Sequence, residues 1–263
     1  MDLNLTNKTV IVMAASQGLG KATALEFAKE GANVVISSRN EEELQRAVDH
    51  IHEAAPSASV MYKVCDITKG DDIKNLVQSA ADQYGTVDVL INNAGGPPAG
   101  GFDKFSDEEW QRAFELNLLS FVRAIREVLP HMRKQGGGHI LNFASSSIKQ
   151  TLDNLLLSNT FRAGIVGLAK SLSQELAEDN ILINTLGPGR IATGRVESLD
   201  KIKADKVGLS YDQVKENSEK SIPMGRYGQP EEFAKQAVFL CSGANTYVTG
   251  QSLLVDGGLV KAL

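Results

Sequence analysis

Seven short apolar runs rich in Val, Ile and Leu alternate along the chain with longer segments that carry apolar residues at helical spacing. The runs cover residues 8–14, 33–38, 59–64, 87–92, 138–144, 181–186 and 252–257. Runs of this kind predict β-strands, and their alternation with helices predicts a parallel sheet. Most runs are apolar at nearly every position, which is typical of strands covered by helices on both faces. The pattern predicts a doubly wound α/β fold, a three-layer sandwich around a seven-stranded parallel sheet.

The helical segments carry signals at their ends. Asn40 precedes a run that opens with three glutamates, and asparagine is a favoured N-cap whose helix is further stabilised by acids in the first turn. Ser106, with Glu109 three residues later, predicts a capping box. It would open one long helix that ends at the glycines of residues 136–138, with a kink at Pro130.

Residues 190–230 form a longer and more polar region between the sixth and seventh predicted strands. Its helical fragments have few apolar positions to bury. In an α/β sheet this region follows the carboxyl end of a strand, which is the edge where ligands bind. We interpret it as a mobile segment that covers the substrate, and a plain surface excursion is the alternative.

Composition excludes several classes of protein. The chain has 263 residues, of which 42% are hydrophobic and 22% charged, and it fits a single domain over residues 1–263. Its net charge is -5 and its basic residues are scattered, which argues against nucleic-acid binding. No run approaches the roughly 20 apolar residues of a membrane span, and the first residues lack a secretion signal. A cytoplasmic protein is expected.

No group of residues predicts a metal site or a disulfide. Cys65 and Cys241 lie far apart in apolar surroundings and are expected to be small buried side chains. Trp110 stands at helical spacing from Phe114 and is expected to pack against its neighbours. The histidines have no partner at the spacing of metal ligands; they are His50, His52, His131 and His139.

The first predicted strand runs into a glycine-rich stretch, MAASQGLG at residues 13–20, which opens the first helix. Gly18 and Gly20 leave room for a phosphate to approach the backbone, and the N–H groups of the helix start can hold a pyrophosphate. A second strand follows 13 residues after Gly20. This order of strand, glycine loop, helix and strand indicates a nucleotide site more strongly than the glycines alone.

Further motifs follow the glycine stretch in a fixed order: Asp66 in CDIT, NNAG at residues 92–95, Asn117 in ELNLLS, Ser145 in NFASSS, and Asn184, Pro188, Gly189 and Thr193 in NTLGPGRIAT. Over essentially its whole length the chain resembles the short-chain dehydrogenase/reductase family, and within it the 3-oxoacyl-(acyl-carrier-protein) reductases. The resemblance implies a Rossmann fold. It departs from the family at Ala14, where a glycine is usual. We expect a slightly altered turn there, with cofactor binding retained.

The resemblance also implies a nicotinamide cofactor and no metal. The matching positions that would contact the cofactor are Ala14, Ser16, Gln17, Gly18, Leu19, Gly20, Ser38, Arg39, Asp66, Ile67, Asn93, Ala94, Gly95, Arg162, Pro188, Gly189, Ile191 and Thr193. An acid at the end of the second strand would bind the ribose 2′-OH of NAD, but the chain has Ser37, Ser38 and Arg39 there. These donors suit a 2′-phosphate and favour NADP(H) over NAD(H). Alternatively, Arg39 stacks on adenine or faces solvent.

In this family a tyrosine and a lysine four residues apart, together with a serine, form the reaction centre. Ser145 matches the serine, and 13 residues later the tyrosine position falls on Ser158 and the lysine position on Arg162. The downstream helix continues the family pattern, with Ile165, Leu168, Leu172 and Leu176 on one face. The resemblance therefore implies Asn117, Ser145, Ser158 and Arg162 as catalytic residues, with the usual pair replaced.

This replacement changes the proton chemistry. A serine hydroxyl has no accessible ionisation near neutral pH, and an arginine keeps the charge of the lysine, and can still hydrogen-bond ribose hydroxyls, but does not shuttle protons. Loss of the general acid typically costs 10²–10⁴-fold in rate. A water held by Ser145, Ser158 and Asn117 is our preferred donor. Tyr211 and Lys149 are alternatives, although each is expected to be a surface residue.

Two functions remain open. The first is an NADP-dependent oxidoreductase that reduces a ketone or 3-oxoacyl-type carbonyl, or oxidises the matching secondary alcohol. The second is a nucleotide-binding protein of the same fold that has lost hydride transfer and acts as a sensor or binding partner. In both cases a small-molecule ligand and a homo-oligomer, a tetramer or dimer, are expected, since helix surfaces with Leu118, Phe121, Val122 and Leu168 match the family's dimer face.

Overall fold

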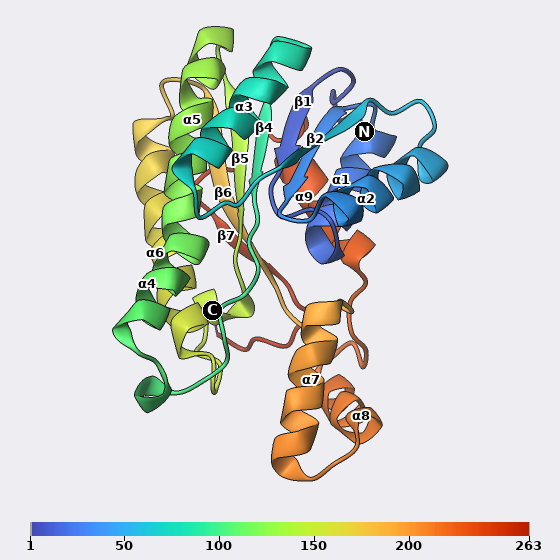
Figure 1. Ribbon diagram of the computed structural model, residues 1–263, viewed down its shortest axis with the longest axis vertical. Coiled ribbons are helices and arrows are strands. Elements are labelled where there is room, and N and C mark those ends of the chain that lie inside the picture. The colour runs from blue at the N-terminus through green and yellow to red at the C-terminus, as the bar shows by residue number, and fades with distance from the viewer. Residues whose placement is uncertain (1, 263) are drawn as a thin grey trace.

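The computed structural model describes residues 2–262, which form a sandwich around one parallel sheet (Figure 1). The strands are β1 (Thr9–Val12), β2 (Asn33–Ser38), β3 (Val60–Val64), β4 (Val89–Asn92), β5 (Gly138–Phe143), β6 (Ile181–Pro188) and β7 (Ser252–Val255). They lie in the order β3-β2-β1-β4-β5-β6-β7, and every neighbouring pair is parallel. The predicted doubly wound fold with seven parallel strands is confirmed.

Helices cover both faces of this sheet (Figure 1). One face carries α1 (Gly18–Lys29), α2 (Glu41–Ala54) and α9 (Pro230–Leu240), and the other carries α3 (Gly70–Tyr84), α5 (Ser120–Gln135) and α6 (Leu156–Glu175). Successive strand residues point to opposite faces, so that Val89 and Ile91 join the first apolar core and Leu90 joins the second. The continuous apolar runs of the sequence follow from this double coverage.

The strand order reverses between β1 and β4, because β2 and β3 lie on one side of β1 and the later strands on the other. In such sheets the carboxyl ends of the strands at this switch point bound a crevice. The glycine stretch follows β1 there, and the NNAG motif begins at Asn92, the last residue of β4. The topology thus brings the two motifs to the same edge.

The predicted helix caps are confirmed. The side chain of Asn40 accepts a hydrogen bond of 3.0 Å from the N–H of Glu43 at the start of α2. Ser106 and Glu109 form a capping box at the start of α4 (Asp107–Phe114). The one long helix expected after Ser106 is wrong in detail, because a π-helical turn at Glu115–Leu119 separates α4 from α5. Pro130 lies within α5, which continues to Gln135.

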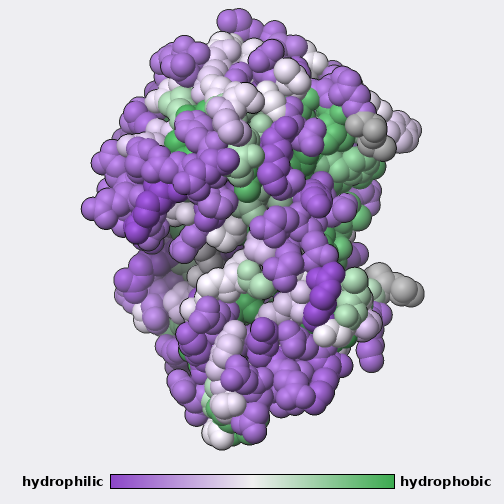
Figure 2. All heavy atoms as spheres, turned by 90° about the vertical axis from the view of Figure 1, so that its right-hand side faces the viewer, coloured by the Kyte–Doolittle hydropathy of each residue, from purple (hydrophilic) through white to green (hydrophobic). Residues whose placement is uncertain are grey.

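The polar region after β6 forms α7 (Gly194–Val207) and α8 (Tyr211–Ser221), which lie beyond the sheet at the bottom of Figure 1. These helices bury little, as expected: Asp200 and Ala204 in α7, and Val214 and Ser218 in α8. Figure 2 shows a mainly hydrophilic surface here and a hollow between this part and the body above it.

A buried polar cluster fixes this part to the chain that follows β6. Asp200 is fully buried, accepts a hydrogen bond of 2.7 Å from the hydroxyl of Tyr227, and pairs with the guanidinium of Arg190. The Arg190 guanidinium also lies 5.9 Å from the centre of the Tyr227 ring. Burial, foremost, raises the pKa of Tyr227, so this hydroxyl stays protonated as the donor.

Several packing expectations can be compared with the structure. Trp110 packs edge-on against Phe161 at 5.8 Å between ring centres, and both cysteines are buried, as expected. The placement of Phe121 on an exposed helix surface is wrong, because its side chain is fully buried in the second core. Leu118, Val122 and Leu168 are half-buried. Among residues 2–262, no helix is long and apolar enough to cross a membrane.

Candidate active site

The glycine stretch forms a tight passage between β1 and α1. A Cβ on Gly20 would lie 2.8 Å from the backbone O of Ala14, from Cα of Ala15 and from Nδ2 of Asn93, so only glycine fits. Nδ2 of Asn93 donates to the carbonyl oxygens of Met13 and Ala14 at 3.1 and 3.0 Å. Asn93, in the loop after β4, therefore holds the glycine loop in place.

Ala14 adopts the left-handed region with φ +48°. The slightly altered turn expected from its Cβ is therefore wrong: the backbone conformation is one that favours glycine, and alanine bears its strain. Left-handed conformation costs an L-residue roughly 1–2 kcal/mol. The surrounding contacts, including the bond from Asn93 to the Ala14 carbonyl, hold the loop in this conformation.

The start of α1 has the features of an anion site. Its N-cap, Gln17, makes no side-chain capping bond, and its first turn contains no acid. The first N–H groups of the helix therefore lack a side-chain acceptor, and they are aligned with the positive end of the helix dipole. Gly18 has φ +58°, and a Cβ there would lie 3.8 Å from Cγ2 of Thr193. The glycine loop and Thr193 thus face each other at a distance that leaves room for a phosphate chain beside them.

The end of β2 carries the residues expected to read the ribose. Arg39 is exposed and Ser38 is half-buried, with its hydroxyl bonded to the backbone of Asn40. The expectation for Ser37 is wrong: its side chain is fully buried and its hydroxyl has no partner, so it cannot reach a ligand. Ser16 Oγ donates a 3.1 Å hydrogen bond to Glu43 Oε2, which places a carboxylate that sequence reasoning missed.

Asp66 lies just beyond β3, at the same edge. Its Oδ1 accepts hydrogen bonds of 3.0 and 2.8 Å from the N–H and hydroxyl of Thr68. Burial alone would raise the pKa of Asp66, but these bonds and the nearby charge of Arg39 outweigh it and lower the pKa. The carboxylate is therefore ionised at neutral pH. Ile67 beside it is buried.

Helix α6 presents Ser158 and Arg162 one turn apart. Arg162 is only 5% exposed, and all of its hydrogen bonds go to neutral oxygens. Its Nη1 donates to the carbonyl of Phe143 at 2.8 Å, and its Nη2 to Ala94 O at 3.4 Å and to Asn117 Oδ1 at 3.0 Å. Arg162 thereby joins α6 to the ends of β4 and β5.

The electrostatic position of Arg162 is unusual, because it forms no ion pair among residues 2–262. Burial, and secondarily the positive charge of Arg195, lower the pKa of Arg162 to about 10. The guanidinium is still protonated at neutral pH. A buried cation without a carboxylate creates a positive potential at this edge of the sheet.

Asn117 and Ser145 flank this guanidinium. Asn117 lies in the π-helical turn, is fully buried, and donates to Ala113 O at 3.2 Å while accepting from Arg162. π-turns of this kind often occur at functional sites. The half-buried Ser145 caps a short turn by accepting a bond of 3.2 Å from Ser147 N. Ser158 is 9% exposed, and its hydroxyl makes no hydrogen bond within the described residues.

The chain after β6 completes the edge. Ile191 is buried, Pro188, Gly189 and Thr193 are half-buried, and the side chain of Thr193 caps α7. Asn184, earlier in the same motif, donates to Val248 O at 2.7 Å and accepts from Gln251 N at 3.0 Å. These bonds fix the loop before β7 against β6.

Comparison with known proteins decides the family. A family model described as enoyl-(acyl carrier protein) reductase matches residues 13–260. The chain belongs to the short-chain dehydrogenase/reductase family. A 3-oxoacyl-(acyl-carrier-protein) reductase of Thermotoga maritima is 36% identical over 98% of this chain and 100% of its own length. The NADPH-dependent reductase BacG of Bacillus subtilis is 32% identical over 98% and 100%, respectively.

A solved structure agrees with these relatives. L-sorbose reductase from Gluconobacter frateurii, complexed with NADPH and L-sorbose, matches with a TM-score of 0.94 and 32% identity, covering 100% of both chains. As a member of the short-chain dehydrogenase/reductase family, the protein is an oxidoreductase that uses NAD(P) and acts on CH–OH and C=O groups.

Other candidates of the sequence lie elsewhere in this short-chain fold. Lys149 is exposed, and Tyr211 begins α8 with Lys201 Nζ at 5.9 Å from its ring centre. His50 and His52 are exposed on α2, and His131 is half-buried on α5. No cluster of metal-ligating residues occurs in the described part of the chain.

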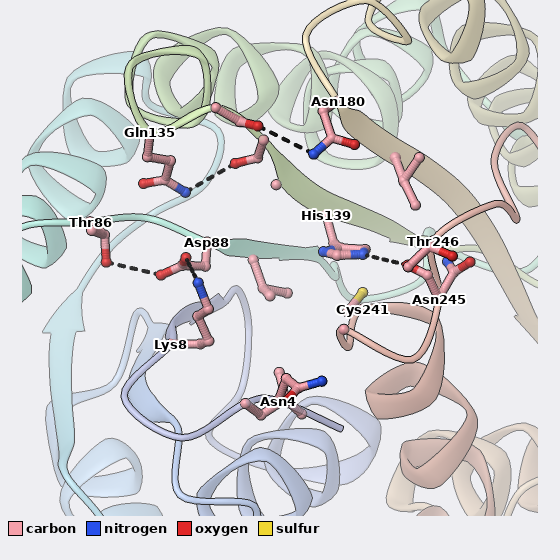
Figure 3. Close-up of a pocket in the computed structure, with 17 residues that line it drawn as sticks. Asn4, Lys8, Thr86, Asp88, Gln135, His139, Asn180, Cys241, Asn245 and Thr246 are labelled. Atoms are coloured by element: carbon pink, nitrogen blue, oxygen red, sulfur yellow. Dashed lines mark hydrogen bonds and ion pairs between the residues drawn. The ribbon is translucent and has the colours of Figure 1, made fainter. Parts of the chain in front are cut away.

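A second cavity lies at the opposite edge of the sheet, at the amino ends of the strands. It has a volume of about 390 Å³ (Figure 3). Figure 3 shows Lys8 pointing toward Asp88, with Nζ and Oδ1 2.9 Å apart, and His139 pointing toward Asn245, whose carbonyl accepts a 3.2 Å bond from Nε2. None of the predicted site residues lines this cavity.

Sequence reasoning missed one residue at the candidate site. Arg195, the second residue of α7, reaches across to the loop after β4 and donates a 2.8 Å bond from Nη2 to Pro97 O. Its position two residues after Thr193, inside the region expected to cover the substrate, was the available signal.

Proposed function

We propose that this protein is an NADP(H)-dependent oxidoreductase that reduces a ketone or 3-oxoacyl-type carbonyl, or oxidises the matching secondary alcohol, with a proton donor other than tyrosine. One observation carries the proposal: α6 holds Ser158 beside a buried, uncompensated guanidinium, that of Arg162, at the carboxyl edge of the sheet. Positive charge fixed at the place where an alkoxide develops is a main source of catalysis in carbonyl reduction.

The residues at this edge fit a dinucleotide. In this proposal the glycine loop and the uncapped start of α1 hold the pyrophosphate. Asp66 and Ile67 bound the adenine, and Asn93, Ala94 and Gly95 line the floor between the halves. Pro188, Gly189, Ile191 and Thr193 border the nicotinamide. When bound, the cofactor supplies or accepts the hydride.

We infer NADP(H) over NAD(H) from the end of β2, where Ser38 and exposed Arg39 stand without an acid at the strand end. Several similar proteins have NADPH in their names or descriptions. Glu43 opposes this preference, because its carboxylate on Ser16 lies near the start of the glycine loop. Arg39 must therefore offset a nearby negative charge when the 2′-phosphate binds.

The proposed chemistry assigns separate tasks to the two hydroxyls and the cation. Ser145 and the unpartnered hydroxyl of Ser158 orient the substrate oxygen. Arg162 stabilises negative charge on that oxygen through its field, since its Nη atoms are bonded to the protein. The proton is carried by water held at Ser145 and Ser158. The Asn117 side chain holds Arg162 rather than the water, because both its ends are bonded inside the protein.

We also propose that the segment of residues 190–230 covers the substrate, and that the protein forms a dimer or tetramer through α5 and α6. The first proposal is supported by the small buried area of α7 and α8, and the second by the half-buried Leu118, Val122 and Leu168. The molecular mass in solution, measured by light scattering, tests the assembly.

The test of function combines binding and turnover. NADPH binding is followed by fluorescence, and NADPH oxidation is measured over a panel of ketones and 3-oxoacyl thioesters. The wild type should bind NADPH and turn over, and Ser158→Ala should slow turnover by about 10-fold or more. Thr160→Ala is the matched control, because it removes an exposed hydroxyl from the same helix.

The double variant Ser158→Tyr with Arg162→Lys separates the two functional hypotheses. Tight NADPH binding with no turnover until both changes are made would overturn the proposal and leave a sensor or binding protein. Wild-type turnover that the double change does not improve would exclude the sensor. Failure to bind either nicotinamide cofactor would defeat both.

A further inference from the structure

Arg195 lies across the mouth of the candidate site. It stands in the first turn of α7, and its guanidinium packs on the backbone of Gly96, directly after the NNAG motif. A Cβ on Gly96 would lie 3.1 Å from Nη2 and 3.2 Å from Nε of Arg195. Glycine at this position therefore gives the guanidinium a place to rest, and the 2.8 Å bond to Pro97 O fixes it there.

The charge of Arg195 is placed unfavourably for the protein itself. A cation in the first turn of a helix is opposed by the helix dipole. Burial lowers the pKa of Arg195, which shows that the protein binds its charged form less well than water does. Arg162 adds a second positive charge close enough to be affected by Arg195.

No acid compensates this pair in the structure. Neither Arg195 nor Arg162 takes part in an ion pair among residues 2–262. Their hydrogen bonds all go to carbonyl oxygens or to an amide oxygen. Arg195 uses only Nη2, so Nη1 and Nε keep donors for a ligand. Two guanidinium groups without a carboxylate, at a site open to solvent, are matched by an anion from outside the chain.

We propose that Arg195 binds a carboxylate of the substrate, so that the substrates are oxo acids and the matching hydroxy acids. This inference rests on the proposed function and specifies its substrate class. The guanidinium fork of Arg195 suits a carboxylate, and Arg162 adds attraction from deeper in the site.

The cofactor's own phosphates have other partners in this protein. The pyrophosphate position faces the uncapped start of α1, and the 2′-phosphate position faces Arg39 at the end of β2. Arg195 instead lies against Gly96 and Pro97, beyond β4, and its charge reaches Arg162 on the helix that carries Ser158. These neighbours place its free donors on the substrate side of the cleft.

The experiment compares each oxo acid with its own methyl ester. The probes are 2-oxobutanoate, 3-oxobutanoate and 4-oxopentanoate with their esters, offered to the full-length protein with NADPH. The kcat/KM values and the Kd of each acid for the protein–NADP+ complex are measured, together with the Kd of NADPH. The variants are Arg195→Gln, Arg195→Lys and, as the matched control, Lys203→Gln, which removes an exposed cation from the same helix.

Arg195→Gln should lower kcat/KM and affinity for the preferred acid by about 10- to 100-fold, since a hydrogen bond to a charged group is lost. The ester and the NADPH affinity should change less than about 2-fold, Arg195→Lys should retain part of the acid preference, and Lys203→Gln should resemble wild type. Gly96→Ala should displace the guanidinium and weaken acid binding, whereas Gly101→Ala, whose Cβ would meet nothing within 4 Å, should not.

Equal losses for acid and ester in Arg195→Gln would overturn the inference. Weaker NADPH binding with unchanged acid preference would also overturn it and assign Arg195 to a cofactor phosphate. If no carbonyl is reduced but acids still bind in an Arg195-dependent manner, the anion subsite stands and the proposed reductase activity fails.

Discussion

Nη2 of Arg162 donates a hydrogen bond of 3.0 Å to Oδ1 of Asn117, and this bond joins the α6 helix to the π-helical turn before α5. Only a longer contact of 3.4 Å, to Ala94 O, would remain for Nη2 without it. Replacement Asn117→Leu should therefore destabilise the protein by about 1.5–3 kcal/mol, because a buried charged donor loses its acceptor. The free energy of unfolding in urea measures this. Gln111→Ala on the exposed face of α4 is the control, and equal stabilities of the two variants would contradict the role assigned to Asn117.

The strain at Ala14 can be tested by two opposite substitutions. Ala14→Gly should stabilise the protein by about 0.5–1 kcal/mol, because relief of the left-handed penalty exceeds the entropy that glycine adds to the unfolded chain. Gly20→Ala should cost about 1–3 kcal/mol, because its Cβ would overlap Ala14, Ala15 and Asn93. Thermal unfolding of both variants checks the sign, and a loss of stability in Ala14→Gly would show that the turn is not strained.

Cofactor choice depends on Arg39 in this account. Arg39→Leu should raise the Kd for NADPH by about 10-fold or more and leave that for NADH nearly unchanged, since only NADPH carries the 2′-phosphate. Glu43→Gln should act in the other direction and tighten NADPH binding, because it removes a carboxylate near Ser16. Fluorescence titration with both cofactors measures the effects. Parallel changes for NADPH and NADH would contradict the assignment of Arg39 to the phosphate.

His139, in the cavity remote from the site, should make stability depend on pH. Burial is the main cause that lowers its pKa, and the hydrogen bond to Asn245 O and the charge of Asp88 only partly oppose it. Below about pH 6.5 the unfolded chain therefore binds a proton that the folded protein resists, so stability is present above that pH and falls below it. His139→Gln should flatten the stability profile between about pH 7.5 and 5.5, and the exposed His50→Gln should not.

The sequence predicts the sheet, both helical layers and the order of the motifs, because these depend on local patterns of apolar residues and glycines. The π-helical turn at Glu115–Leu119 could not be predicted, since its sequence is compatible with an ordinary helix and tertiary packing decides. The buried positions of Ser37 and Phe121 likewise depend on which face of an element meets the core.

The candidate site shows the same division between local and long-range information. Asn93, Asp66 and Thr193 come from motifs and lie at the expected edge of the sheet. Arg195 is brought there by the path of the chain after β6, and its contact with Gly96 joins residues that are far apart in the sequence. The bonds of Arg162 to backbone carbonyls were also beyond prediction, because carbonyl directions are set by the fold.

The most direct test of the central claim follows the hydride itself. Wild-type protein is incubated with NADPH that carries deuterium at C4 of the nicotinamide and with the preferred carbonyl compound, and the product alcohol is analysed by mass spectrometry. The account predicts deuterium on the carbinol carbon, slower formation with Ser158→Ala, and no loss of NADPH binding in that variant. Tight NADPH binding without deuterium transfer to any carbonyl of the panel would contradict it.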